Sequence, residues 1–103
     1  MSLARIIAPL LDNFHRRRRA NGLMRQANAF YQKGSFSEAA EIYRQAVNVE
    51  PNRAVLRFNL GLALYKSGRK REGRAEWEQV RELAKGTNAY MLEQAEIMLR
   101  QFS

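Results

Sequence analysis

The residues of this chain that could take part in acid–base or metal chemistry are few and scattered. The sequence contains one histidine, His15, one aspartate, Asp12, and no cysteine. His15 stands beside an arginine run that opposes its protonation, and no serine or cysteine partner is near it in sequence. The glutamates lie among arginines, as Glu72 and Glu76 do, which is typical of solvent-facing helical charge. We therefore expect no enzyme activity, no metal site and no cofactor.

Anion binding is the chemistry that the charge distribution favours instead. Lysine and arginine number 18 against 10 acidic residues, which gives a net charge of +8. Residues 1–25 hold six arginines and a single acid. Lipid headgroups and nucleic-acid phosphates are anions that such clusters bind. The candidate residues for contact with an anionic membrane or another anion are Arg5, Arg16, Arg17, Arg18 and Arg19.

The segment 1–19 combines this charge with an apolar stripe. Its large apolar residues recur at steps of three and four, the spacing of an amphipathic helix; they are Leu3, Ile6, Ile7, Leu10, Leu11 and Phe14. Pro9 would kink this helix or open a shorter one. We expect the segment to dock on an anionic membrane or a partner protein. Packing back over the rest of the chain, nucleic-acid binding and organelle targeting are alternatives.

No stretch of about 18 or more apolar residues is present, so a membrane-spanning helix is not expected. The apolar run near the N-terminus is interrupted by Arg5, and the basic cluster follows it, which is the wrong order for a secretory signal. We therefore expect a cytoplasmic protein that is peripheral on a membrane if the arm docks there.

From residue 20 onward the chain repeats itself at an offset of 34 residues. The repeated positions are small residues, rings and glycines: Ala27, Gly34, Ala39 and Tyr43 fall on Gly61, Gly68, Gly73 and Trp77. Small residues let two helices approach closely, and a glycine after a helix permits the left-handed cap. Pro51 is expected to end one helix, whereas Lys85 stands at the matching end of the next copy, so that helix is expected to run on towards Gly86.

This offset and these residue types resemble the tetratricopeptide repeat, whose period is 34 residues. The resemblance covers about residues 20–87. It implies an all-α fold of helical hairpins, a fragment of a right-handed α-solenoid. We expect four parts: a basic amphipathic arm at 1–19, repeats at 20–53 and 54–87, and a half repeat or capping helix at 88–103 that continues the same offset.

The resemblance also implies a binding surface, because stacked hairpins of this kind line a concave groove with their first helices. Rings and amides on such a face suit an extended peptide or a partner helix. The groove residues implied by the register are Met24, Arg25, Asn28, Tyr31, Gln32, Val55, Phe58, Asn59, Leu62, Tyr65 and Lys66.

The last helix has apolar residues on two sides, as if it were sandwiched between neighbours. A terminal helix should instead be polar outside, so one side needs a cover. A second copy, a different subunit or the N-terminal apolar stripe could supply it, and we expect another chain. The candidate residues for this oligomer or partner face are Tyr90, Met91, Ile97, Met98 and Phe102.

The sequence as a whole therefore predicts a protein-binding module, acting as an adaptor, scaffold or assembly factor. The alternatives are a basic protein associated with nucleic acid and a structural subunit of a larger complex. The fold class does not choose the partner, because repeats of this kind serve many tasks.

Overall fold

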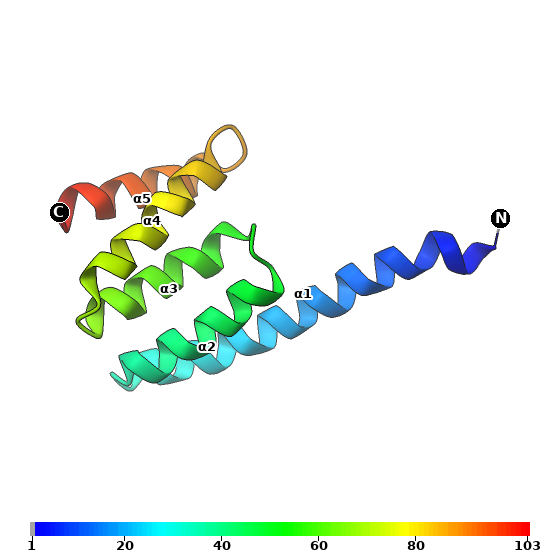
Figure 1. Ribbon diagram of the computed structural model, residues 1–103, viewed down its shortest axis with the longest axis horizontal. Coiled ribbons are helices and arrows are strands. Elements are labelled where there is room, and N and C mark those ends of the chain that lie inside the picture. The colour runs from blue at the N-terminus through cyan, green and yellow to red at the C-terminus, as the bar shows by residue number, and fades with distance from the viewer. Residues whose placement is uncertain (1) are drawn as a thin grey trace.

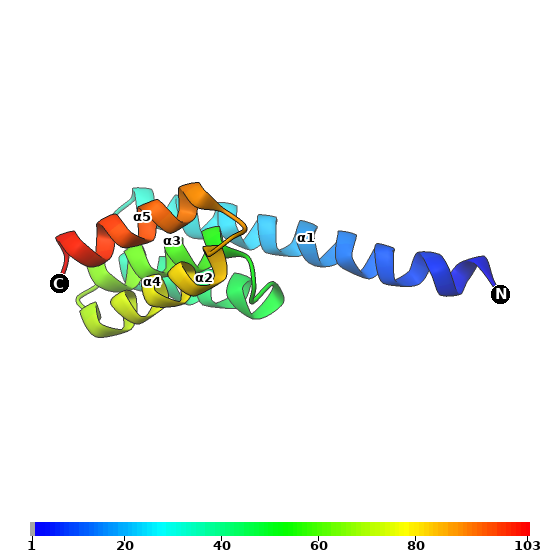
Figure 2. The same ribbon diagram turned by 90° about the horizontal axis from the view of Figure 1, so that it is seen from above.

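The computed structural model describes residues 2–103 and contains five α-helices within them (Figure 1). They are α1 (Leu3–Gln32), α2 (Phe36–Val49), α3 (Ala54–Lys66), α4 (Lys70–Ala84) and α5 (Ala89–Gln101). Each helix packs against the next one along the chain, and α3 also contacts α5. Figure 2 shows α1, α3 and α5 along one side of the molecule and α2 and α4 along the other. The all-α hairpin-repeat fold is thus confirmed.

The two repeats end their first helices in the same way. Gly34 and Gly68 follow α1 and α3 with φ values of 82° and 97°. The N–H of Gly34 donates to the carbonyl of Tyr31, and the next N–H donates to Phe30. The same two bonds recur 34 residues later, from Gly68 to Tyr65 and from the next residue to Leu64. These are Schellman caps, which need a left-handed residue after the helix, so the predicted role of both glycines is confirmed.

The two small residues predicted to let α3 and α4 approach are the closest point between those helices. A Cβ placed on Gly61 would lie 2.5 Å from Nε1 of Trp77, and a Cβ on Gly73 would lie 2.7 Å from the carbonyl oxygen of Gly61. Trp77 is fully buried against this contact. Glycine stands at position 73, where the first repeat has Ala39, because the backbone of α3 occupies the space of a methyl group.

The core forms two neighbouring clusters. The first lies between α1, α2 and α3 and includes Ala27, Tyr43 and Leu60. The second lies between α4 and α5 and includes Val80 and Met91. No polar side chain is buried within residues 2–103, so packing of apolar residues holds the stack together.

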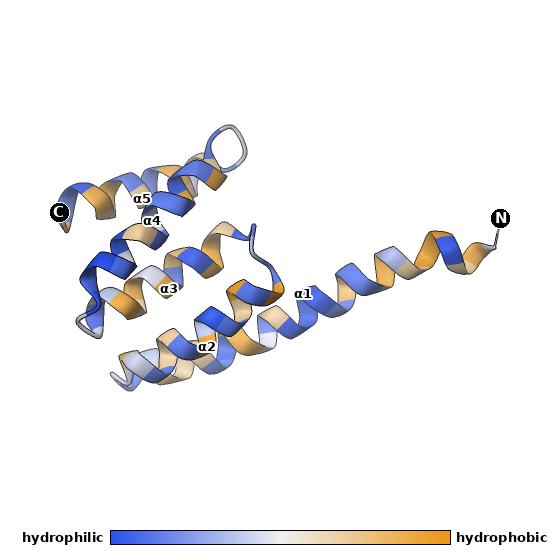
Figure 3. Ribbon diagram, in the orientation of Figure 1, coloured by the Kyte–Doolittle hydropathy of each residue, from blue (hydrophilic) through white to orange (hydrophobic). Residues whose placement is uncertain are grey.

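The segment 1–19 is continuous with the first repeat. Helix α1 runs for 30 residues through the boundary expected at residue 19, with Pro9 inside it. Its first half projects beyond the other helices, and apolar and polar residues alternate along it (Figures 1 and 3). The alternative in which this segment folds back over the repeat is therefore not what the structure shows. We call the exposed large apolar residues of this segment the α1 stripe; they are Leu3, Ile6, Ile7, Leu10, Leu11 and Phe14.

The end of the second repeat changes the register of α5. Helix α2 ends at Val49, before Pro51, whereas α4 has 15 residues against 14 in α2. Helix α4 is therefore longer than α2 by one residue. It ends at Ala84 and does not run on to Gly86, as the lysine at position 85 had suggested; Gly86 has a φ of 72°. Helix α5 consequently begins 35 residues after α3, and the expected continuation of the 34-residue offset is wrong by one.

Candidate functional site

Eleven predicted groove residues lie on the first helices of the two repeats, and the structure divides them into two groups. One group packs against the core clusters and has little side chain left for a ligand; it comprises Met24, Tyr31, Val55 and Phe58. The other group is exposed or half-buried without being part of those clusters; it comprises Arg25, Asn28, Gln32, Asn59, Leu62, Tyr65 and Lys66. We call the surface formed by α1, α3 and α5 the α1–α3–α5 face.

Asn28 already has a partner within the chain. Its side-chain oxygen accepts a hydrogen bond from the hydroxyl of Tyr43 on α2. Burial raises the pKa of that hydroxyl to about 12, and the neighbouring phenol of Tyr31 adds to the shift. In the second repeat Trp77 takes the place of Tyr43 and donates from Nε1 to the carbonyl of Phe58 at 3.3 Å. These bonds connect the two helices of each repeat. The side-chain oxygen of Asn28 is therefore already used within the chain and is not free for a ligand.

An apolar hollow of about 270 Å³ opens between α3, α4 and α5. Its lining joins three predicted groove residues to three residues from α4 and the C-terminal region: Leu62, Tyr65, Lys66, Trp77, Met98 and Phe102. The rings of Tyr65 and Trp77 stack at 5.5 Å between centroids, and Phe102 lies 5.0 Å from Tyr65. The hollow is therefore walled by aromatic side chains, the type of surface that holds an apolar anchor of a partner.

Two of the five residues predicted for the oligomer or partner face on α5 pack against other helices of the same chain. Met91 is buried against α4, and Phe102 packs on the rings of Tyr65 and Trp77. Met91 therefore belongs to the chain's own core, whereas the half-buried ring of Phe102 packs at the end of α5.

Of the other three predicted residues, Met98 lines the apolar hollow, and the same register places Tyr90 and Ile97 differently from the expectation. Counted from α3, Tyr90 and Ile97 take the positions of Val55 and Leu62. Tyr90 is 67% exposed and Ile97 is half-buried. They extend the α1–α3–α5 face onto the last helix, where the sequence suggested a separate contact surface.

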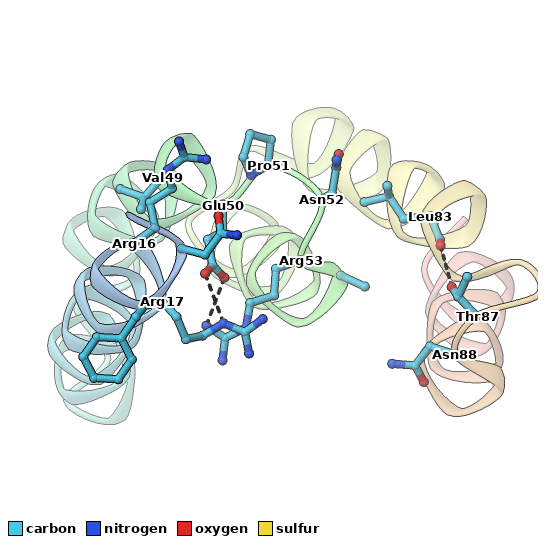
Figure 4. Close-up of a pocket in the computed structure, with 13 residues that line it drawn as sticks. Arg16, Arg17, Val49, Glu50, Pro51, Asn52, Arg53, Leu83, Thr87 and Asn88 are labelled. Atoms are coloured by element: carbon cyan, nitrogen blue, oxygen red, sulfur yellow. Dashed lines mark hydrogen bonds and ion pairs between the residues drawn. The ribbon is translucent and has the colours of Figure 1, made fainter. Parts of the chain in front are cut away.

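A second, larger hollow of about 820 Å³ lies between the middle of α1 and the turns that follow α2 and α4. Figure 4 shows Glu50 between Arg17 and Arg53, with Leu83, Thr87 and Asn88 across the hollow. We call it the basic hollow.

The charged side chains of the basic hollow are partly paired with one another. Glu50 accepts from Arg17 at 3.0 Å and from Arg53 at 3.4 Å, and Arg53 also donates to Asn21 at 2.6 Å. Glu50 is not among the site residues predicted from the sequence. Its place directly before Pro51, in the turn between the repeats, was the available signal, because such a turn is brought next to the preceding first helix.

The five arginines predicted to contact anions are all exposed. Arg17 differs from the others because its guanidinium pairs with Glu50. Within residues 2–103, none of the helices combines the length and the hydropathy needed to cross a bilayer. The same residues contain no group of three potential metal ligands among their histidine, cysteine and acidic side chains.

Comparison with known proteins agrees with this geometry. A family model described as TPR repeat matches residues 27–68, from the C-terminal part of α1 to the glycine that caps α3. A comparison with curated proteins found no match. Repeats of this family are protein-interaction modules in general and are typically not catalytic. The matched segment, the five-helix architecture and the duplicated helix caps fit a tetratricopeptide-like repeat protein.

Proposed function

We propose that the α1–α3–α5 face binds a short segment of a partner protein and that the chain serves as an adaptor or assembly factor through this contact. The observation that supports the proposal is the apolar hollow of about 270 Å³, because predicted groove residues and aromatic rings line it together. An apolar side chain of the partner would enter the hollow and exclude water there.

The charges around the hollow indicate the kind of segment that fits. Lys66 is exposed at its rim, and its ammonium group lies 5.7 Å from the ring of Phe36. Arg25 is exposed on the same face. A cation at the rim of an apolar site favours a segment that carries an acidic residue next to its apolar anchor. Gln32 and Asn59 are available to bond the main chain of that segment.

A crosslinking experiment tests where the partner binds. A photoreactive residue at Lys66 should capture a protein in cells, whereas the same residue at Ala75, exposed on α4, should not. The captured segment is then made as a peptide and titrated into the purified chain. Trp77 is the only tryptophan and lines the hollow, so binding there should shift its emission.

The matched variants are Leu62→Glu, which places a charge in the lining of the hollow, and Ala75→Glu, which places one outside it. We expect Leu62→Glu to weaken peptide binding at least about tenfold, the loss of one well-packed anchor contact, and Ala75→Glu to leave it unchanged. Equal crosslinking from both positions, or binding that survives Leu62→Glu in the folded variant, would contradict the proposal.

A further inference from the structure

The α1 stripe contains six of the eight large hydrophobic residues that lie exposed within residues 2–103. Leu3, Leu10 and Phe14 are 69%, 63% and 55% exposed. They lie on the part of α1 that projects beyond the repeats (Figure 1). A contiguous exposed apolar patch on a charged helix marks an interaction site.

The spacing within the stripe is that of a two-helix coiled coil. Its central row, Leu3, Ile7, Leu10 and Phe14, advances by four, three and four residues, which is the heptad pattern of core positions. Ile6 and Leu11 flank this row on either side. The row is symmetric about the point between residues 8 and 9. When such a row is turned end for end, each large residue meets another large residue of the same row.

We infer that α1 pairs with the α1 of a second copy of this chain in the antiparallel direction. Leu3 then packs against Phe14 of the second copy, and Ile7 packs against Leu10. Both contacts occur twice because the pair is symmetric, as in most homodimers.

The arginine run decides the direction of the pairing. In a parallel pair, the residues 16–19 of both chains lie side by side and repel each other. In the antiparallel pair centred between residues 8 and 9, the two runs are about 27 Å apart along the helix axis, at 1.5 Å per residue. This separation exceeds the Debye length of about 8 Å at physiological salt, so the repulsion is screened.

The corner between α1 and the repeats accommodates the end of the second helix. Phe14 lines the basic hollow together with Leu83 and Thr87 from the turn after α4. The stripe therefore ends inside a corner and not on an open plane. Another helix lying along the stripe would bring its first turn into this hollow. A flat lipid surface laid on the stripe would meet the turn after α4 as well.

The pairing ends where the row becomes polar. Continued by the same steps, it passes through Arg17, Asn21, Met24 and Asn28, whose side chains already contact Glu50, Arg53, the first core cluster and Tyr43 of the same chain. The contact is therefore confined to the first half of α1, and each chain keeps its binding face free. A small interface of this kind is typical of reversible association, so the dimer should depend on protein concentration.

Because the chain has no cysteine, the geometry can be tested by disulfide formation between two variants. Leu3→Cys and Phe14→Cys are oxidised separately and as a mixture. The antiparallel pair predicts little product from either variant alone and a mixed covalent dimer from both, because only residues 3 and 14 come within disulfide reach. The matched control is Arg5→Cys with Asp12→Cys. These positions lie at the same symmetric levels but on the far side of the helix, so they should not crosslink.

Light scattering measures the association itself. The full chain should approach twice its single-chain mass of 12.0 kDa as concentration rises, and Leu10→Glu should remain a monomer with unchanged helicity. A full chain that stays monomeric throughout overturns the inference, and so do disulfides that form within each single variant, which indicate parallel pairing. A monomer that sediments with vesicles of phosphatidylglycerol but not of phosphatidylcholine would assign the stripe to a lipid surface instead.

Discussion

Gly73 and Gly22 both lie inside helices, but their surroundings differ. A Cβ on Gly73 would stand 2.7 Å from the Gly61 carbonyl oxygen and 2.9 Å from the Tyr65 nitrogen, both backbone atoms. A Cβ on Gly22 would meet only the end of the Arg25 side chain, at 3.8 Å. The close contact at Gly73 is with atoms that cannot move aside without separating α3 from α4.

The same substitution should therefore have opposite effects at the two sites. Gly73→Ala should lower the free energy of unfolding by about 1–3 kcal/mol, because overpacking outweighs the roughly 1 kcal/mol that alanine contributes to a helix. Gly22→Ala should raise it by about 0.5–1 kcal/mol. Urea denaturation of both variants measures this difference, and stabilisation by Gly73→Ala would show that the α3–α4 contact is looser than described.

Tyr43 makes stability depend on pH in the alkaline range. Burial raises its pKa from 10.0 to about 12, so the folded chain keeps the proton after the unfolded chain has lost it. The contribution is fully present below pH 10 and is lost as the pH rises towards 12. Tyr43→Phe should cost about 1 kcal/mol at neutral pH through the lost hydrogen bond to Asn28.

The pH dependence separates this effect from a general loss of stability. Between pH 10 and 12, urea denaturation of Tyr43→Phe should show a shallower fall in the free energy of unfolding than the parent chain shows. Tyr90→Phe is the control, because that side chain is 67% exposed and its replacement should leave the slope unchanged. An equal slope in all three proteins would mean that Tyr43 is not the group responsible.

At the scale of the helices, the features that recur at the 34-residue offset were predictable from the sequence. Glycine after a helix and small residues opposite rings each solve a local packing problem, so the residue type indicates the structure. Gly34, Gly68 and Gly61 are examples, and the structure confirms each of them. The end of α2 at Val49, before Pro51, follows from the same local reasoning.

The remaining features depend on helix lengths and on the register between helices, which the type of a single residue does not determine. One added residue in α4 rotates α5, which buries Met91 and moves Tyr90 and Ile97 to groove positions. The continuity of α1 through Pro9 likewise could not be read from the sequence, because proline disfavours a helix interior but does not forbid it. The apolar hollow joins residues from three helices, and only the register of α5 brings Phe102 to Tyr65.

At the scale of the whole molecule, the helices form a chain of neighbours. Helix α1 contacts α2, and α5 contacts α4 and, less extensively, α3. In repeat proteins of this kind, stability is approximately the sum of the units and the contacts between neighbours. The C-terminal end is held by the ring of Phe102 and by Arg74, whose guanidinium donates to the carbonyls of Leu99, at 3.2 Å, and Phe102. Loss of packing at the C-terminal end should therefore destabilise the helices near that end more than the helices far from it.

Phe102→Ala tests this nearest-neighbour coupling. The change removes a half-buried ring from Tyr65 and Trp77 and should cost about 2 kcal/mol, less than the 3–5 kcal/mol of a fully buried phenylalanine. Hydrogen exchange should show the largest loss of protection in α5, a smaller loss in α3 and α4, and little change in α2. Tyr31→Ala, which removes a ring packed on the first core cluster and on Phe36 of α2, should give the reverse order. An equal loss of protection in every helix would mean that the stack unfolds as one cooperative unit, because each amide would then exchange only through complete unfolding.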